Sequence, residues 1–102
     1  MDILVRIKRA VLAGHFVFSD KAEMEMERDD LTELDVMESI LTAPAIYKTV
    51  RSTSPSRLRG KEKLHIIVSP NLSGLLIYTK GKLASRGGVD TYYFLVSSKR
   101  AL

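Results

Sequence analysis

The chain has 102 residues, which fits one domain with a single core, and a net charge of +4. Its lack of cysteine excludes disulfides, thiolate zinc sites and cysteine nucleophiles, and its only two histidines, His15 and His65, exclude a histidine-rich metal site. No apolar run approaches the roughly 20 residues that a membrane-spanning helix needs, and the N-terminus lacks the uninterrupted apolar core of a signal peptide, so we expect a cytoplasmic protein without a membrane segment.

The first predicted helix covers residues 2–13, and Gly14 is suited to end it. Its expected buried face consists of Ile3, Ile7, Ala10 and Val11. Residues 15–18 then form a short extended link whose two phenylalanines we expect in the core. His15, which follows the glycine, is interpreted as a surface or capping residue and not as a ligand.

Two further helices are predicted before Pro44. Ser19 or Asp20 caps the first of them. Thr32 caps the second, since Asp35 follows it at capping-box spacing. The expected buried stripe of the last helix consists of Leu34, Met37, Ile40 and Leu41.

The rest of the chain predicts four strands. Residues 61–82 form a central hairpin, in which two apolar runs are joined by turn residues. Residues 45–50 and 91–96 form the other two strands. The remaining segments are basic: a loop over 51–61, a mobile segment over 81–90 with a glycine hinge, and a fraying tail over 97–102.

The predicted fold class is therefore α+β: three N-terminal helices packed on a mainly antiparallel sheet of about four strands, in a single domain over residues 1–102. Charge follows the same division. Residues 20–39 carry nine acidic and two basic residues, a net −7, whereas residues 40–102 carry eleven basic and two acidic residues, a net +9. A basic sheet suits an anionic partner, most commonly a nucleic acid; the alternative is ordinary solubilising surface charge.

Several stretches of the chain resemble a known group of proteins. Residues 18–48 resemble the opening of a small family of unknown function, with a short helix, an acidic turn, an (I/L)-T-x-x-D-V helix and a strand. That family is related to the MqsR toxins of bacterial toxin–antitoxin systems. Residues 7–19, 45–50 and 75–82 are similar to the opening helix, the Tyr-Lys strand and the late lysine-ended strand of those toxins. The resemblance covers about residues 5–82 and implies a RelE-like fold that cleaves messenger RNA without a metal.

The resemblance also implies roles for individual residues. Lys48 matches the family's strand lysine and Lys80 its late lysine. His65 stands where the toxins have a functional tyrosine, because its spacing to Lys80 is the same, and this difference changes the group that transfers the proton. Polar positions of the family's middle loop fall near Arg57 and Arg59, and either residue could bind phosphate.

Metal-independent RNA cleavage uses the 2′-hydroxyl of the substrate as nucleophile, so the enzyme must supply a base, an acid and cations. His65 is the best candidate for acid or base because an unperturbed histidine titrates near pH ~6.5; alternatively, it is a structural residue of an apolar strand. Lys48, Lys80 and Arg59 complete the predicted catalytic set, with no metal or cofactor. The predicted RNA-binding residues are Arg51, Arg57, Lys61, Tyr78, Lys82 and Arg86.

Two functions from different classes remain. The first is a toxin that cleaves mRNA, either free or on the ribosome, and is neutralised by a cognate antitoxin protein that covers the basic sheet. The second is a non-catalytic module that binds RNA or another protein through the same surface. Cleavage distinguishes them, because both predict salt-sensitive binding of an anion.

Overall fold

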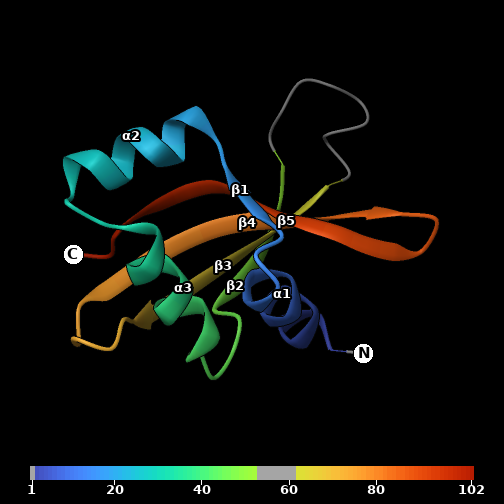
Figure 1. The fold of residues 1–102 in the computed structure, drawn as a ribbon, viewed down its shortest axis with the longest axis horizontal. Helices are drawn as coiled ribbons and strands as arrows, with labels where there is room; N and C mark the ends of the chain where they lie inside the picture. The colour runs from blue at the N-terminus through green and yellow to red at the C-terminus, as the bar shows by residue number, and fades with distance from the viewer. Residues whose placement is uncertain (1, 53–61) are drawn as a thin grey trace.

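A computed structural model describes residues 2–52 and 62–102 (Figure 1). The described elements, in chain order, are α1 (Ile3–Leu12), β1 (Phe16–Phe18), α2 (Asp20–Arg28), α3 (Glu33–Leu41), β2 (Lys48–Arg51), β3 (Lys63–Pro70), β4 (Leu76–Arg86) and β5 (Val89–Arg100). The strands form one sheet in the order β1-β5-β4-β3-β2. β1 runs parallel to β5, and the other neighbouring strands are antiparallel.

The sheet differs from the one that the sequence predicts. The α+β class and the three helices are as expected, but the prediction of about four, mainly antiparallel strands is wrong, because the described sheet has five strands and one parallel pair. The additional strand is β1, which the sequence pattern predicts as an extended link. Phe16 of β1 pairs with Tyr93 of β5. No local turn signal indicates a pairing between segments so far apart in the chain.

The hairpin near the C-terminus is longer than expected. Residues 81–90, predicted to be a mobile segment, belong to β4, β5 and the tight turn between them, where Gly87 and Gly88 have φ angles of 60° and 80°. Positive φ at both central residues is the requirement of a type I′ hairpin turn, so the two glycines form a turn and not a hinge. β5 then continues to Arg100, so most of the predicted fraying tail is strand.

α3 begins with the predicted capping box between Thr32 and Asp35. Its buried stripe is partly different from the prediction. Leu34 is 60% exposed, whereas Val36 is buried and packs in the core with Ile40. Leu34 precedes Val36 by two residues, about 200° around a helix, so the two side chains cannot share one face.

α2 covers the edge of β5 with carboxylates in place of a neighbouring strand. Glu25 Oε1 accepts the backbone N–H of Ser98 at 3.2 Å, and Asp29 Oδ2 accepts that of Arg100 at 2.9 Å. Four residues of helix and two residues of strand both advance by about 6 Å, so the acceptors match the spacing of the donors. The part of β5 that extends past β1 is thereby protected from pairing with another chain.

α1 and α3 pack against the same face of the sheet and form the core with it (Figure 1). The largest fully buried side chains of this core are Ile7, Val11, Val36, Ile40, Ile67, Ile77, Tyr93 and Leu95. We call the face turned away from α1 and α3 the open face. By strand alternation and register it carries Lys48, Ile66, Tyr78, Lys80, Lys82, Phe94 and Lys99.

Gly81 leaves room for the ring of Tyr93. A Cβ at position 81 would lie 2.6 Å from Tyr93 Cζ and 2.8 Å from the carbonyl oxygen of Phe94. Tyr93 is fully buried, and its hydroxyl donates to the carbonyl oxygen of His65 at 3.5 Å. The ring therefore crosses β4 beneath Gly81 and ties β5 to β3 at the position of His65.

We expect Gly81→Ala to lower the free energy of unfolding by about 1–3 kcal/mol, because the methyl group must displace a buried ring and a backbone oxygen. Urea denaturation followed by circular dichroism measures this change. Ser73→Ala, at an exposed turn position, is the control and should change the free energy by less than about 0.5 kcal/mol. A Gly81→Ala protein as stable as the wild type contradicts the packing described for Tyr93.

Candidate functional site

The described residues of the predicted catalytic set are divided between the two faces of the sheet. Lys48 of β2 and Lys80 of β4 both pair with Ile66 of β3, so they flank it on the open face. His65 is the preceding residue of β3 and pairs with Gly81, so its side chain lies on the other face, the side of α1. The fold brings Lys48 and Lys80 together but does not bring His65 to them.

The other predicted residues lie at the margins of the sheet or outside the described chain. Arg51, at the end of β2, and Arg86, at the end of β4, are exposed. Arg57, Arg59 and Lys61 lie outside the described residues. Tyr78 and Lys82 belong to the open face.

The open face combines cations with aromatic rings, and Glu25 of α2 borders it, because Lys99 Nζ lies 4.0 Å from Glu25 Oε2. Lys82 Nζ lies 5.6 Å from the centroid of the Phe94 ring, and Lys99 Nζ lies 5.2 Å from that of Tyr78. Lys48 is exposed on β2, the edge strand next to β3. Ammonium groups attract phosphates, and partly exposed rings can stack on bases. The open face therefore offers ammonium groups and partly exposed rings, with Lys82 paired to Glu62 and Lys99 to Glu25.

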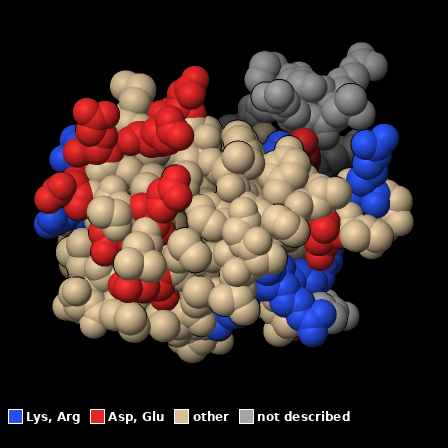
Figure 2. Space-filling view, viewed as in Figure 1, with Lys and Arg blue, Asp and Glu red and all other residues tan. Residues whose placement is uncertain are grey.

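The charges of the molecule are separated in space. Figure 2 shows acidic side chains gathered over α2 and α3 and a cluster of lysine and arginine side chains beside α1. A negatively charged polymer outside the protein is repelled by the acidic helices and attracted toward α1 and the sheet. This field favours the same side of the molecule as the cavities described next.

His65 lines a cavity of about 510 Å³, which we call the His65 cavity. The cavity lies where β3 begins and β4 continues past it. The cationic side chains in its lining are Arg6, Lys63 and Lys82, and Tyr92 also contributes. Lys82 Nζ is paired with Glu62 Oε2 at 2.8 Å. Since Lys82 also belongs to the open face, the His65 cavity adjoins that face along β4.

The environment of His65 favours the neutral imidazole. His65 is 7% exposed, and its pKa is lowered first by burial and then by the positive charges of Lys63 and Arg6. Its Nδ1 lies 3.1 Å from Thr49 Oγ1. When Nδ1–H donates to the hydroxyl oxygen, Nε2 keeps a free lone pair and can accept a proton. His65 is therefore suited to act as a general base near neutral pH.

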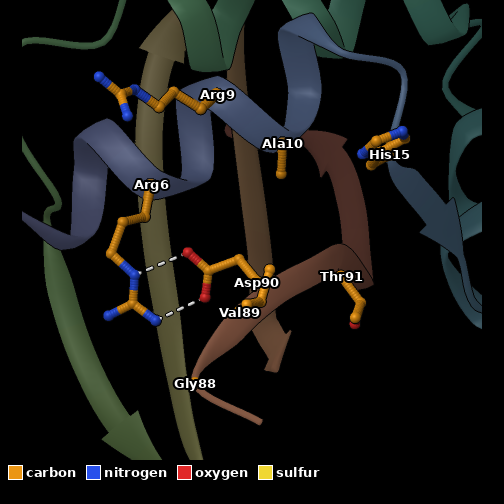
Figure 3. Close-up of a pocket in the computed structure, with 8 residues that line it drawn as sticks. All are labelled: Arg6, Arg9, Ala10, His15, Gly88, Val89, Asp90 and Thr91. Carbon is orange, nitrogen blue, oxygen red and sulfur yellow. Dashed lines mark hydrogen bonds and ion pairs between the residues drawn. The ribbon is translucent and has the colours of Figure 1, made fainter. Parts of the chain in front are cut away.

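Arg6 and Asp90 form a bidentate ion pair between α1 and the β4–β5 hairpin (Figure 3). Arg6 Nε donates to Asp90 Oδ2 at 2.8 Å, and Nη2 donates to Oδ1 at 2.6 Å. Ser85 Oγ donates to Oδ1 at 2.8 Å. The hydrogen bond from Arg6, followed by that from Ser85, lowers the pKa of Asp90 to about 2. Asp90 therefore remains ionised and fixes the guanidinium of Arg6.

Arg6 also lines a second cavity, of about 460 Å³, between α1 and the start of β5 (Figure 3). We call it the Arg9 cavity. Arg9 and His15 are both exposed and line it together with Thr91. Because Arg6 lines both cavities, they are neighbours.

Sequence reasoning does not identify Arg6, Lys63 or Asp90 as site residues. One signal was available, because Asp90 is one of two acidic residues between positions 40 and 102. Another is the spacing of Arg6 and Arg9, which makes them neighbours on the surface of α1. His15 is exposed, as interpreted from the sequence, but it also lines the Arg9 cavity.

No family model, curated protein or solved structure matches the chain. In residues 2–52 and 62–102, no group of three His, Cys, Asp or Glu side chains is arranged to hold a metal ion. None of the described helices has the length and apolar character needed to cross a membrane.

We expect Lys63→Gln to raise the pKa of His65, because the variant removes one of the positive charges that lower it. The pH dependence of the histidine ring signals in NMR spectra measures this pKa directly. Lys21→Gln removes the same charge from an exposed position on α2 and is the control. If both variants leave the pKa of His65 unchanged, Lys63 does not act on the imidazole as described.

We expect Asp90→Asn to lower the urea midpoint of unfolding at pH 7 and to have little effect near pH 2. The folded-state pKa of Asp90 is about 2, below its ordinary value. The ion pair therefore stabilises the fold above about pH 4, and this stabilisation is lost as the pH falls toward 2. Midpoints measured across this range for the wild type and for Asp90→Asn test the loss.

The control for this series is Glu27→Gln, which removes an exposed carboxylate of α2. Its midpoints should follow those of the wild type at every pH. An Asp90→Asn protein that does the same is inconsistent with a stabilising Arg6–Asp90 pair.

Proposed function

We propose that the protein is a metal-independent endoribonuclease that binds single-stranded RNA on the open face and cleaves it at the His65 cavity. One observation carries this proposal: His65, whose pKa is lowered by burial and by nearby positive charge, lines the same cavity as three cations, Arg6, Lys63 and Lys82, and one carboxylate, Glu62. A base and several cations are what cleavage through a 2′-hydroxyl requires.

We infer the path of the RNA from Lys82, because this residue belongs to the open face and also lines the His65 cavity. A strand that contacts Lys48 and Lys80 through its phosphates can stack bases on Tyr78 and Phe94. Lys82 follows Lys80 on the same side of β4 and also lines the His65 cavity. In this proposal Lys48 and Lys80 bind the RNA, and the residues of the His65 cavity carry out the cleavage.

The reaction uses the RNA's own hydroxyl. Neutral His65 takes the proton of the 2′-hydroxyl, whose oxygen forms a bond to the adjacent phosphorus. The bond between phosphorus and the 5′-oxygen breaks, and that oxygen takes a proton from the ammonium group of Lys63. Arg6 and Lys82 stabilise the negative charge that develops on the phosphoryl oxygens. The products are a 2′,3′-cyclic phosphate and a 5′-hydroxyl.

The biological setting in this proposal is the cytoplasm, with mRNA as the substrate and the protein as the toxin of a toxin–antitoxin pair. A cognate antitoxin protein would cover the open face and keep RNA from it. The support for such a partner is the set of lysines and partly exposed rings on that face.

A second candidate function is RNA binding without cleavage. The observation that favours it is the separation of His65 from Lys48 and Lys80, which lie on opposite faces of the sheet. Both candidates use the open face, and only the first needs the His65 cavity.

We expect the purified protein to cleave single-stranded RNA in the presence of EDTA and to leave cyclic-phosphate and 5′-hydroxyl ends. His65→Gln should lower the rate at least about 100-fold, because glutamine can bond to Thr49 but cannot accept the proton. Lys80→Gln should weaken RNA binding and reduce the salt slope by about 0.7 per lost phosphate contact. Gel analysis of product ends and binding isotherms at several salt concentrations measure these effects.

Lys21→Gln, on the acidic side of the molecule, is the matched control and should leave both cleavage and binding unchanged. RNA that is bound but uncut, with and without translating ribosomes, supports the second candidate and rejects the nuclease. RNA that is not bound rejects both.

A further inference from the structure

The Arg9 cavity has two kinds of wall. Arg6 and Arg9 of α1 line one part of it, and Ala10 and Val89 form an apolar part next to Gly88. Figure 3 shows Arg6 of α1 reaching toward Asp90 of the β4–β5 hairpin and Ala10 facing the hairpin, while the Arg9 side chain extends away from it. Its volume of about 460 Å³ is within the range of small-molecule sites.

The charge of this cavity is only partly compensated. Asp90 is engaged by Arg6 and Ser85, so its carboxylate does not neutralise Arg9. The carbonyl oxygen of Arg9 accepts the N–H of Ala13 at 3.0 Å, but the guanidinium of Arg9 makes no hydrogen bond or ion pair with the described residues. Arg9 therefore supplies an unpaired guanidinium at the edge of the cavity, and this exposed side chain can turn to bind a phosphate with two parallel hydrogen bonds.

Together, a cationic wall and an apolar wall match the two halves of a nucleotide. The phosphate requires charge and N–H donors, and the base and sugar require a surface with few polar groups. Surface lysines alone would bind phosphate without distinguishing what is attached to it. A cavity that also offers Ala10 and Val89 can bind the nucleoside part.

We propose that the Arg9 cavity is a nucleotide subsite that binds one nucleoside monophosphate unit of the RNA strand, next to the unit that is cleaved in the His65 cavity. This inference rests on the proposed function, because the strand that enters one cavity continues into the other. Arg6 lines both cavities, so its fixed guanidinium lies between the two units. Arg9 binds the phosphate of the second unit, and Ala10 and Val89 contact its nucleoside.

The two histidines of the chain make the test specific, because one lines each cavity. Adenosine 5′-monophosphate is titrated into the labelled protein while the ring signals of His15 and His65 are followed by NMR. We expect the signals of His15 to shift in a saturable manner. Arg9→Gln should weaken this binding at least about tenfold, since it removes a charge-assisted pair. Lys21→Gln should not change it.

Arg9 is exposed, and the backbone amide spectrum of Arg9→Gln shows whether the fold is intact. A shift of His15 with inorganic phosphate that equals the shift with the nucleotide overturns the nucleotide subsite. Binding that moves only the signals of His65, or that Arg9→Gln leaves unchanged, overturns it as well. If RNA is still cleaved in any of these cases, the proposed nuclease stands and only the subsite fails. If RNA is neither bound nor cleaved, both fail.

Discussion

The Arg6–Asp90 ion pair joins α1 to the β4–β5 hairpin across 84 positions of the chain. Both side chains are partly exposed, 31% and 25%, so solvent screens the pair and its stabilisation of the fold is modest. Its effect is mainly on geometry, because two parallel hydrogen bonds fix the plane of the guanidinium. Arg6 lines both cavities, so the shape of each depends on this one orientation. The ion pair thus holds the candidate site together.

The alternation of side chains along β3 decides which residues can act together. His65 and Ile66 are adjacent, so their neighbours across the sheet lie on opposite faces. Lys48 and Lys80 accompany Ile66, whereas Arg6 and Lys63 surround His65. This separation assigns strand binding to one face and chemistry to the other in the proposed function. Lys82 of β4 connects the two regions, because it belongs to the open face and also lines the His65 cavity.

The sequence predicts the features that depend on local interactions. The capping box at Thr32 and the central hairpin depend on residues a few positions apart, and both were predicted. The parallel pairing of β1 with β5 depends on partners far apart in the chain, for which the sequence carries no turn signal. His65 was identified because it interrupts an apolar run. Arg6, which lines the same cavity, comes from the first helix, and its position beside His65 depends on tertiary packing that periodicity does not predict.

The proposed function requires RNA to occupy the open face and the adjoining cavities. The most direct measurement maps the backbone amide shifts of uncleaving His65→Gln protein on addition of a single-stranded RNA of about ten nucleotides. We expect shifts in β2, β3 and β4 and around Arg6 and Arg9, with α3 and the exposed residues of α2 unaffected. Shifts confined to the acidic helices would contradict RNA binding on the open face. The absence of any shift at an RNA concentration high enough to saturate a basic surface would contradict it as well.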